Sequence, residues 1–149
     1  MSTEENKATT RRAFFEEIWN QGNLAVVDEL CTPNFIYHTP TGPVQGPEGF
    51  KQFATMYRTA IPNLHITIDD MFAEADKVVT RWTARGTHLG PLMDIPPTGK
   101  QATVTGIVIG RFEGGKFVEG WLEFDALRFT LTGSSQSVCC PTCSFLVLK

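Results

Sequence analysis

The sequence predicts an α+β fold in which helices come first and a run of β-strands follows. Two observations predict this order. Before about residue 62, apolar residues recur at helical spacing in short segments that end at glycine or proline. After that point, apolar and polar residues alternate over long runs separated by turn signals, as in strands with one buried face. We therefore expect a cone-shaped, curved antiparallel sheet with three N-terminal helices enclosing a pocket.

The composition indicates one ordinary globular domain. The chain has 149 residues, of which 42% are hydrophobic and 19% charged, and this length can bury a core without metals or disulfides. The net charge is -3 and no basic tract occurs, which argues against nucleic acid or an anionic membrane as partner. The N-terminal segment Met1–Arg12 is too polar for a signal peptide, and no apolar run reaches membrane-spanning length. We expect a cytoplasmic protein.

Three helices are expected, over about residues 2–22, 23–32 and 47–62. Ser2 followed by Glu5 is a capping-box pattern that marks the start of the first helix. Later elements are expected in the following order: a brief strand over 35–38, a loop over 40–46, strands over 64–73 and 76–88, a loop over 90–99, strands over 101–112 and 117–131, and a Gly114-Gly115 hairpin turn between the last two.

The expected domain spans residues 1–133, with residues 134–149 as a poorly ordered tail. Three cysteines lie in this tail, and Cys140 and Cys143 form a C-x-x-C pair. Zinc would need two further ligands, and no second pair is present, so we interpret these residues as exposed thiols. The histidines also lack metal-binding spacing, and no metal site is expected.

Asp125 is the sharpest candidate for chemistry. Trp121, Glu123 and Asp125 share one face of the last predicted strand because side chains alternate along a strand. A carboxylate beside an indole in a dry cavity has its charged form disfavoured, which would make it a usable general base. The alternative is that Asp125 ends the strand in solvent or bonds a neighbouring turn, and the pattern does not decide between the two.

Two histidines and several aromatic residues complete the candidate site. His38 and His88 each end a predicted strand near a loop, where an imidazole could hold a substrate oxygen or donate a proton. The simpler interpretation of either histidine is a hydrogen bond to its loop. Aromatic residues are mainly expected in the core, but a subset could line a site for a flat or apolar ligand. These candidates for substrate binding are Trp19, Tyr37, Phe53, Tyr57, Trp82 and Trp121.

Several stretches, in this order and at these intervals, resemble the SnoaL-like polyketide cyclases, also called ester cyclases, of the nuclear-transport-factor-2-like superfamily. The likeness covers about residues 6 to 130. The stretches that carry it are Phe15 to Asn23, Phe35 to Pro40, Gly46 to Lys51, Arg81 to His88, Ile95-Pro96-Pro97-Thr98-Gly99-Lys100, Arg111 to Lys116 and Trp121-Leu122-Glu123-Phe124-Asp125.

The resemblance implies a cone-shaped fold, a homodimer formed through the sheets, and an activity without metal or organic cofactor. In characterised cyclases, an aspartate on the last strand removes a proton next to carbonyl groups, and the enolate closes a ring by attacking another carbonyl. Asp125 matches that aspartate by its place after Trp121. An enolate also needs hydrogen-bond donors, for which His38, His88, Tyr37 or Arg85 are candidates. Where many relatives carry a histidine just before the tryptophan, this chain has Gly120.

Three functions follow as hypotheses. The first is a lyase or isomerase acting on a small apolar or aromatic carbonyl compound, with Asp125 as base. The second is an epoxide-hydrolase-like enzyme, which would group Asp70, Glu123 and Arg85 with Asp125. The third is a non-catalytic ligand-binding or dimerisation domain, which would leave the cavity entirely apolar.

Overall fold

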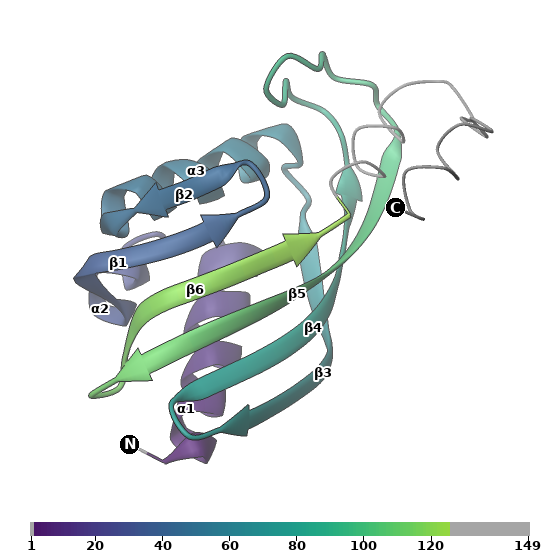
Figure 1. The fold of residues 1–149 in the computed structure, drawn as a ribbon. Helices are drawn as coiled ribbons and strands as arrows, with labels where there is room; N and C mark the ends of the chain where they lie inside the picture. Colours follow the sequence, from purple (N-terminus) through teal and green to yellow (C-terminus); the bar gives the residue numbers. More distant parts are fainter. Residues whose placement is uncertain (1, 126–149) are drawn as a thin grey trace, which may run out of the picture.

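The computed structural model describes residues 2–125 and shows a curved six-stranded sheet with helices packed against one face (Figure 1). This arrangement confirms the α+β fold expected from the sequence. The elements, in order, are α1 (Thr3–Thr9), η1 (Thr10–Asn20), α2 (Val26–Leu30), β1 (Cys31–Thr39), β2 (Gly42–Gln45), α3 (Gly46–Ala60), β3 (His65–Glu74), β4 (Lys77–Thr87), β5 (Gln101–Glu113) and β6 (Lys116–Phe124).

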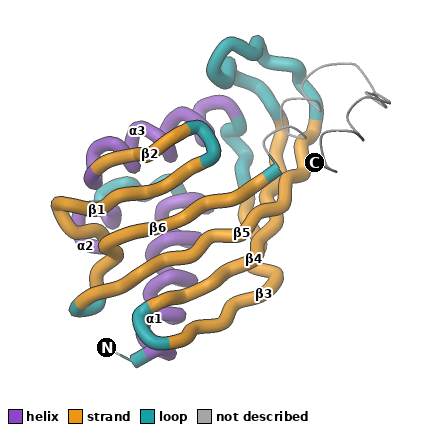
Figure 2. The backbone as a smooth tube through the Cα atoms, viewed as in Figure 1, coloured by secondary structure: helices purple, strands orange, loops and turns teal. Residues whose placement is uncertain are grey.

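The strands lie in the order β2-β1-β6-β5-β4-β3. Within the described residues, every neighbouring pair is antiparallel except β1 and β6, which run parallel. The sheet is thus antiparallel as expected except at this one pair, where the helix α3 and the β3–β5 meander separate the two strands along the chain. Figure 2 shows the helices together on the inner face of the sheet and the other face without helices.

The N-terminal helix begins at the predicted capping box. The Ser2 hydroxyl accepts a hydrogen bond from the Glu5 amide at 3.2 Å, and the Glu5 carboxylate accepts one from the Ser2 amide at 2.7 Å. From Thr10 to Asn20 the helix has π-type geometry, which the sequence pattern did not predict. The helix ends before Gly22, whose positive φ of 75° is the left-handed conformation that glycine commonly adopts just past a helix end.

The segment between the first and third helices differs most from the expectation. The second helix is shorter, with Ala25 rather than Asn23 at its N-terminus, and the strand that follows is longer, over Cys31–Thr39. The segment 40–46, predicted to be a loop, contains the strand β2. β2 is an edge strand, and an edge tolerates Pro43 because one side of the strand needs no partner for its amide groups.

The later strands follow the predicted pattern closely. Val78, Thr80 and Trp82 are buried on the inner face of β4, as their alternation indicates. Gly114 and Gly115 form the turn between β5 and β6 with φ values of 56° and 78°, as the hairpin signal requires. The predicted strand continued to residue 131, but β6 ends at Phe124, and residues 126–149, including the cysteine-containing tail, lie outside the described residues.

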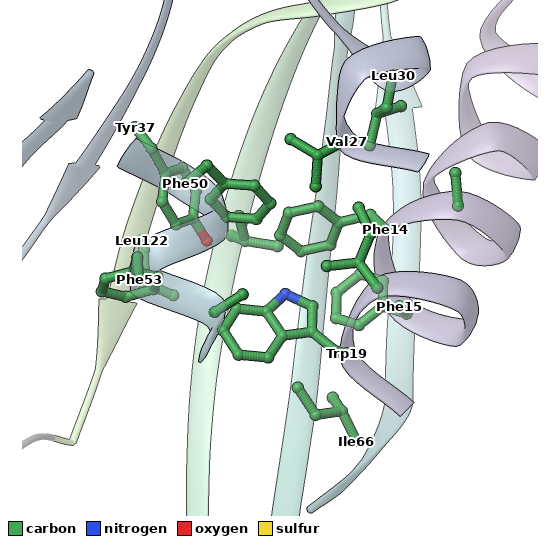
Figure 3. Close-up of a cluster of buried hydrophobic side chains, with 14 of the residues drawn as sticks. Phe14, Phe15, Trp19, Val27, Leu30, Tyr37, Phe50, Phe53, Ile66 and Leu122 are labelled. Atoms are coloured by element: carbon green, nitrogen blue, oxygen red, sulfur yellow. The ribbon is translucent and has the colours of Figure 1, made fainter. Parts of the chain in front are cut away.

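The core fills the space between the helices and the inner face of the sheet. Figure 3 shows aromatic side chains from η1, β1 and α3 gathered there, among them Trp19, Tyr37 and Phe50. Phe50 is fully buried and its ring lies 5.7 Å from that of Phe14 and 5.2 Å from that of Tyr37. No helix within residues 2–125 is long and apolar enough to cross a membrane.

Candidate functional site

A cavity of about 70 Å³ lies between the helices η1 and α3 and the inner face of the sheet. Strands β1, β3, β4, β5 and β6 each contribute to its wall. Of the aromatic residues named from the sequence, five lie on this wall: Trp19, Tyr37, Phe53, Tyr57 and Trp82. The sixth, Trp121, does not, because it points to the opposite face of β6.

Within residues 2–125, the cavity wall consists only of aromatic and aliphatic residues. The side chains on it that carry a polar group are those of Tyr37, Tyr57, Trp19 and Trp82, and the surface of the wall is almost entirely hydrocarbon. Among the described residues, no charged side chain lines the cavity. The cavity is therefore apolar, and the only donors that its lining residues can supply are neutral. Such a site suits an uncharged ligand with oxygen acceptors.

Tyr37 is the most deeply enclosed of these donors. Its side chain is 1% exposed, and its ring lies 5.9 Å from those of both Phe35 and Phe53. Burial, with smaller effects of nearby Cys31 and Tyr57, raises the pKa of the Tyr37 phenol well above its usual value. The phenol consequently keeps its proton throughout the physiological range and remains a donor.

Two glycines in the sheet make room for the aromatic wall. A Cβ atom on Gly120 would lie 2.7 Å from the Tyr37 ring, and one on Gly106 would lie 2.3 Å from the Trp82 indole. Neither approach is possible for a residue with a side chain. The sequence signal for this arrangement is a glycine inside a strand pattern, which often marks a close approach. This signal does not say which ring approaches.

Asp125 lies one residue beyond the end of β6 and is exposed. Leu122 and Phe124 point into the cavity, so strand alternation places Glu123 and Asp125 on the opposite side. The shared face predicted for Trp121 and Asp125 therefore exists, but it is the outer face, and the dry surroundings expected for Asp125 are not found. The amide of Asp125 donates a hydrogen bond to the Thr105 carbonyl at 3.3 Å.

His38 also lies on the outer face, and the structure brings it together with Trp121. Their rings stack with centroids 5.6 Å apart and planes at 17°. The His38 Nε2 atom lies 3.0 Å from Glu119, whose other carboxylate oxygen accepts two hydrogen bonds from Arg111 at 3.3 Å. The hydrogen bond to His38, followed by those from Arg111, holds the pKa of Glu119 below its usual value.

His88 and Arg85 do not line the cavity either. His88 is 3% exposed, and its Nδ1 atom lies 3.2 Å from the Thr98 hydroxyl in the following loop. Its backbone also holds this loop, since its amide donates to the Lys100 carbonyl and its carbonyl accepts from the Gly99 amide. Arg85 is exposed on the outer face of β4. Neither His38 nor His88 therefore lies where it could contact a ligand in the cavity.

The grouping that a hydrolase would need is also missing from the cavity. Asp70, Glu123 and Arg85 are all exposed and lie outside it, which removes the epoxide-hydrolase-like alternative. Within residues 2–125, no three side chains of histidine, cysteine, aspartate or glutamate come close enough together to hold a metal ion.

Solved structures of similar proteins share this fold. A provisionally assigned SnoaL-like polyketide cyclase from Jannaschia sp. is 25% identical, with a TM-score of 0.84 over 90% of this chain and 94% of that chain. TsrD from Streptomyces laurentii is 26% identical, with a TM-score of 0.81 over 91% and 99%. A provisionally assigned polyketide cyclase from Bacillus cereus is 30% identical, with a TM-score of 0.73 over 89% and 85%.

No curated protein matches the chain in sequence. The family model of the SnoaL-like polyketide cyclases, however, matches residues 9–131, which is most of the chain. The curved sheet, the helices on its inner face and the aromatic cavity between them agree with that match. The chain belongs to the SnoaL-like polyketide cyclase family.

Proposed function

We propose that this protein is a cofactor-independent enzyme of the polyketide cyclase type that acts on a small, uncharged apolar or aromatic carbonyl compound. The observation that carries the proposal is the cavity wall, which combines hydrocarbon with neutral donors in a member of the SnoaL-like family. Burial of the ligand's apolar surface would supply most of the binding energy, and the donors would orient its oxygen atoms.

The proposed reaction is proton abstraction next to a carbonyl group, followed by ring closure or isomerisation. Asp125 is the proposed base because the family resemblance assigns it this role; its side chain lies outside the cavity, so the acidic carbon of the substrate would have to extend past Phe124 at the end of β6 to reach it. In the cyclisation, the carbon acid gives its proton to the Asp125 carboxylate and becomes an enolate. The enolate carbon then forms a bond to a second carbonyl carbon of the same molecule, and the resulting alkoxide takes up a proton.

The cavity volume bears on how a substrate would enter. The volume of about 70 Å³ is roughly half of the ~150 Å³ that holds benzene in an engineered protein cavity. A ring-sized substrate therefore requires side chains of the wall to move aside. Phe53 and Tyr57 are candidates for this movement, since both line the cavity and retain 8% and 9% exposure.

The test is the intramolecular aldol reaction of 2,6-heptanedione, followed by NMR. We expect the wild-type protein to accelerate ring closure, and Asp125→Asn to reduce the acceleration by about 10²- to 10⁴-fold, the usual contribution of a general base. Glu123→Gln is the matched control, since it removes an exposed carboxylate two residues earlier on the same face. Full activity of Asp125→Asn would exclude Asp125 as the base.

A second candidate function is ligand binding without turnover. It is favoured by one specific observation, which is that no carboxylate or imidazole of the described residues lies on the cavity wall. Under this alternative, the wild-type protein would bind ketones in the cavity and leave their α-protons unexchanged in D₂O. Exchange that depends on the cavity residues would support the enzyme.

We further propose a homodimer formed through the outer face of the sheet. Residues there that are direct cross-strand neighbours form an apolar stripe across all six strands. From β3 to β2, the stripe consists of Phe72, Val79, Ile109, Trp121, His38 and Pro43. Phe72 is 60% exposed and Pro43 is also exposed, whereas Val79, Ile109, Trp121 and His38 are half-buried. A largely apolar surface strip is typical of an interaction surface. A two-fold dimer would bury the stripe against its own copy.

Light scattering tests the proposed dimer. Ile109→Lys places a charge in the middle of the stripe and should convert the dimer to a monomer with unchanged circular dichroism. Thr103→Lys, an exposed position on the outer face of the same strand but away from the stripe, is the control and should remain dimeric. A monomeric wild-type protein, or a dimeric Ile109→Lys variant, would argue against this interface.

A further inference from the structure

We propose that the Tyr37 hydroxyl is the anchor of the cavity, where it donates a hydrogen bond to the carbonyl oxygen of the bound compound. This inference rests on the proposed function and names the group that fixes the ligand's orientation. It makes Tyr37 a specificity-determining residue, and a catalytic one if the same oxygen becomes the enolate oxygen during turnover.

The Tyr37 hydroxyl borders the cavity, and no described residue accepts its hydrogen. The side chain is 1% exposed and lines the cavity, and none of the hydrogen bonds among residues 2–125 involves its hydroxyl, which is not one of the fully enclosed polar atoms and so borders the cavity space. Figure 3 shows the Tyr37 oxygen directed into the interior of the aromatic cluster, on the side of Leu122. A buried hydroxyl without a partner is costly, and a ligand acceptor would remove that cost.

The second step is that the ring cannot easily turn away. Phe14, Phe35, Phe50 and Phe53 surround it with ring centroids 5.2 to 6.2 Å away. Its other side lies against the backbone of β6 at Gly120, where a Cβ atom would come within 2.7 Å. The donor is therefore held in place before the ligand arrives, which is the condition under which a hydrogen bond contributes most to binding and catalysis.

The third step concerns the ligand class. The other donors on the wall are also neutral, and no lysine or arginine of the described residues lines the cavity. Bringing a carboxylate or phosphate into this cavity would remove its hydration without an opposite charge in return. A ketone or ester oxygen costs far less to desolvate and accepts one hydrogen bond from a phenol. The geometry thus favours uncharged carbonyl compounds over acids of the same shape.

The experiment is a cycle of two ligands and two proteins. Acetophenone and α-methylstyrene have nearly the same shape, but only the ketone can accept a hydrogen bond. Binding of each is measured by titration of the tryptophan fluorescence, since Trp19 and Trp82 lie on the wall. We expect the wild-type protein to prefer the ketone by about three- to tenfold, the range of a typical net hydrogen bond. Tyr37→Phe should abolish this preference and leave the affinity for α-methylstyrene unchanged.

Stability gives a second, independent measurement. If the Tyr37 hydroxyl has no structural partner, Tyr37→Phe should unfold at the same urea concentration as the wild type or a higher one. A clear fall in the midpoint would show a structural hydrogen bond instead and would overturn the inference. Tyr57→Phe, which removes the other phenol of the wall, is measured beside it. Loss of the ketone preference in Tyr57→Phe but not in Tyr37→Phe would likewise overturn the inference.

The outcomes separate this inference from the proposed function. If the wild-type protein binds neither compound at millimolar concentration, both the cavity as a ligand site and the Tyr37 anchor are contradicted. If it binds both compounds and Tyr37→Phe keeps the full preference for the ketone, the anchor is contradicted while the cavity as the ligand site stands.

Discussion

The two faces of one sheet carry opposite chemistry in this protein. The inner face and its helices bring together aromatic rings, aliphatic side chains and neutral donors around a cavity. The outer face carries the ion pairs of Arg111 and Glu119, the stacked pair of His38 and Trp121, and the exposed Phe72. Residues two apart on a strand share a face, so a shift of one residue exchanges these two environments.

The difference between the faces indicates which side chains can contact a ligand in the cavity. Titratable side chains are usually the first candidates for chemistry, but here those of the central strands lie on the face without a cavity. The cavity offers phenol and indole groups instead. A carbonyl ligand would therefore be oriented by neutral donors, and any carboxylate base would have to act from the end of β6, where Asp125 lies.

The largest expected difference between the faces is in stability. Phe50 is fully buried among other rings, so Phe50→Ala should lower the free energy of unfolding by about 3–5 kcal/mol. Phe72 is 60% exposed on the outer face, and Phe72→Ala should change the free energy by less than about 0.5 kcal/mol in the monomer. Urea denaturation of both variants measures this. Equal effects would mean that the burial assigned to the two faces is wrong.

A smaller loss of stability is expected at Gly120, where the inner face of the sheet leaves room for the Tyr37 ring. Gly120→Ala places a methyl group against the Tyr37 ring and should cost about 1–3 kcal/mol through overpacking. It should also displace the Tyr37 hydroxyl and weaken ketone binding. The control is Gly49→Ala in α3, where the added Cβ would lie 3.2 Å from a methyl group of Val44 and no aromatic ring outside the adjoining residues comes within 4 Å. If Gly120→Ala is as stable as the wild type, Tyr37 does not lie as described.

The smallest effect belongs to the outer face. The pKa of Glu119 is lower in the folded chain than its ordinary value of 4.5, so this carboxylate stabilises the fold above its unfolded pKa. That contribution is lost as the pH falls through the lower, folded value. The wild type should exceed Glu119→Gln in stability at pH 7 by at most about 1 kcal/mol, and the difference should shrink as the pH falls below 4.5. Urea midpoints measured across this range provide the test. A difference that stays constant or grows as the pH falls would rule out the ionised carboxylate as its source.

Much of the fold could be predicted because its signals are local. The capping box at Ser2, the positive-φ glycines at 114 and 115 and the alternation along β4 each identify an element without knowledge of its neighbours. The strand β2 could not be found this way. Its Gly/Pro-rich sequence is typical of a loop, and it becomes a strand because it pairs with β1 at the edge of the sheet.

The site was harder to predict, for a physical reason. Alternation shows that Trp121 and Asp125 share a face, but which face is buried depends on the helices that cover the sheet. Leu122 and Phe124 are the residues that point inward, and the sequence alone does not distinguish them from ordinary core residues. The aromatic wall of the cavity was easier to predict than the position of Asp125. Trp19, Phe53 and Trp82 lie on the apolar faces of their helices and strand, and these faces must be buried in any fold of this kind.

The most direct test of the account is a crystal structure of the protein soaked with acetophenone. We expect the ketone inside the cavity, between the indoles of Trp19 and Trp82, with its oxygen about 2.7–2.8 Å from the Tyr37 hydroxyl oxygen. An empty cavity beside a ligand bound to the outer face would contradict the account, because the inner face would then not be the site that recognises carbonyl compounds.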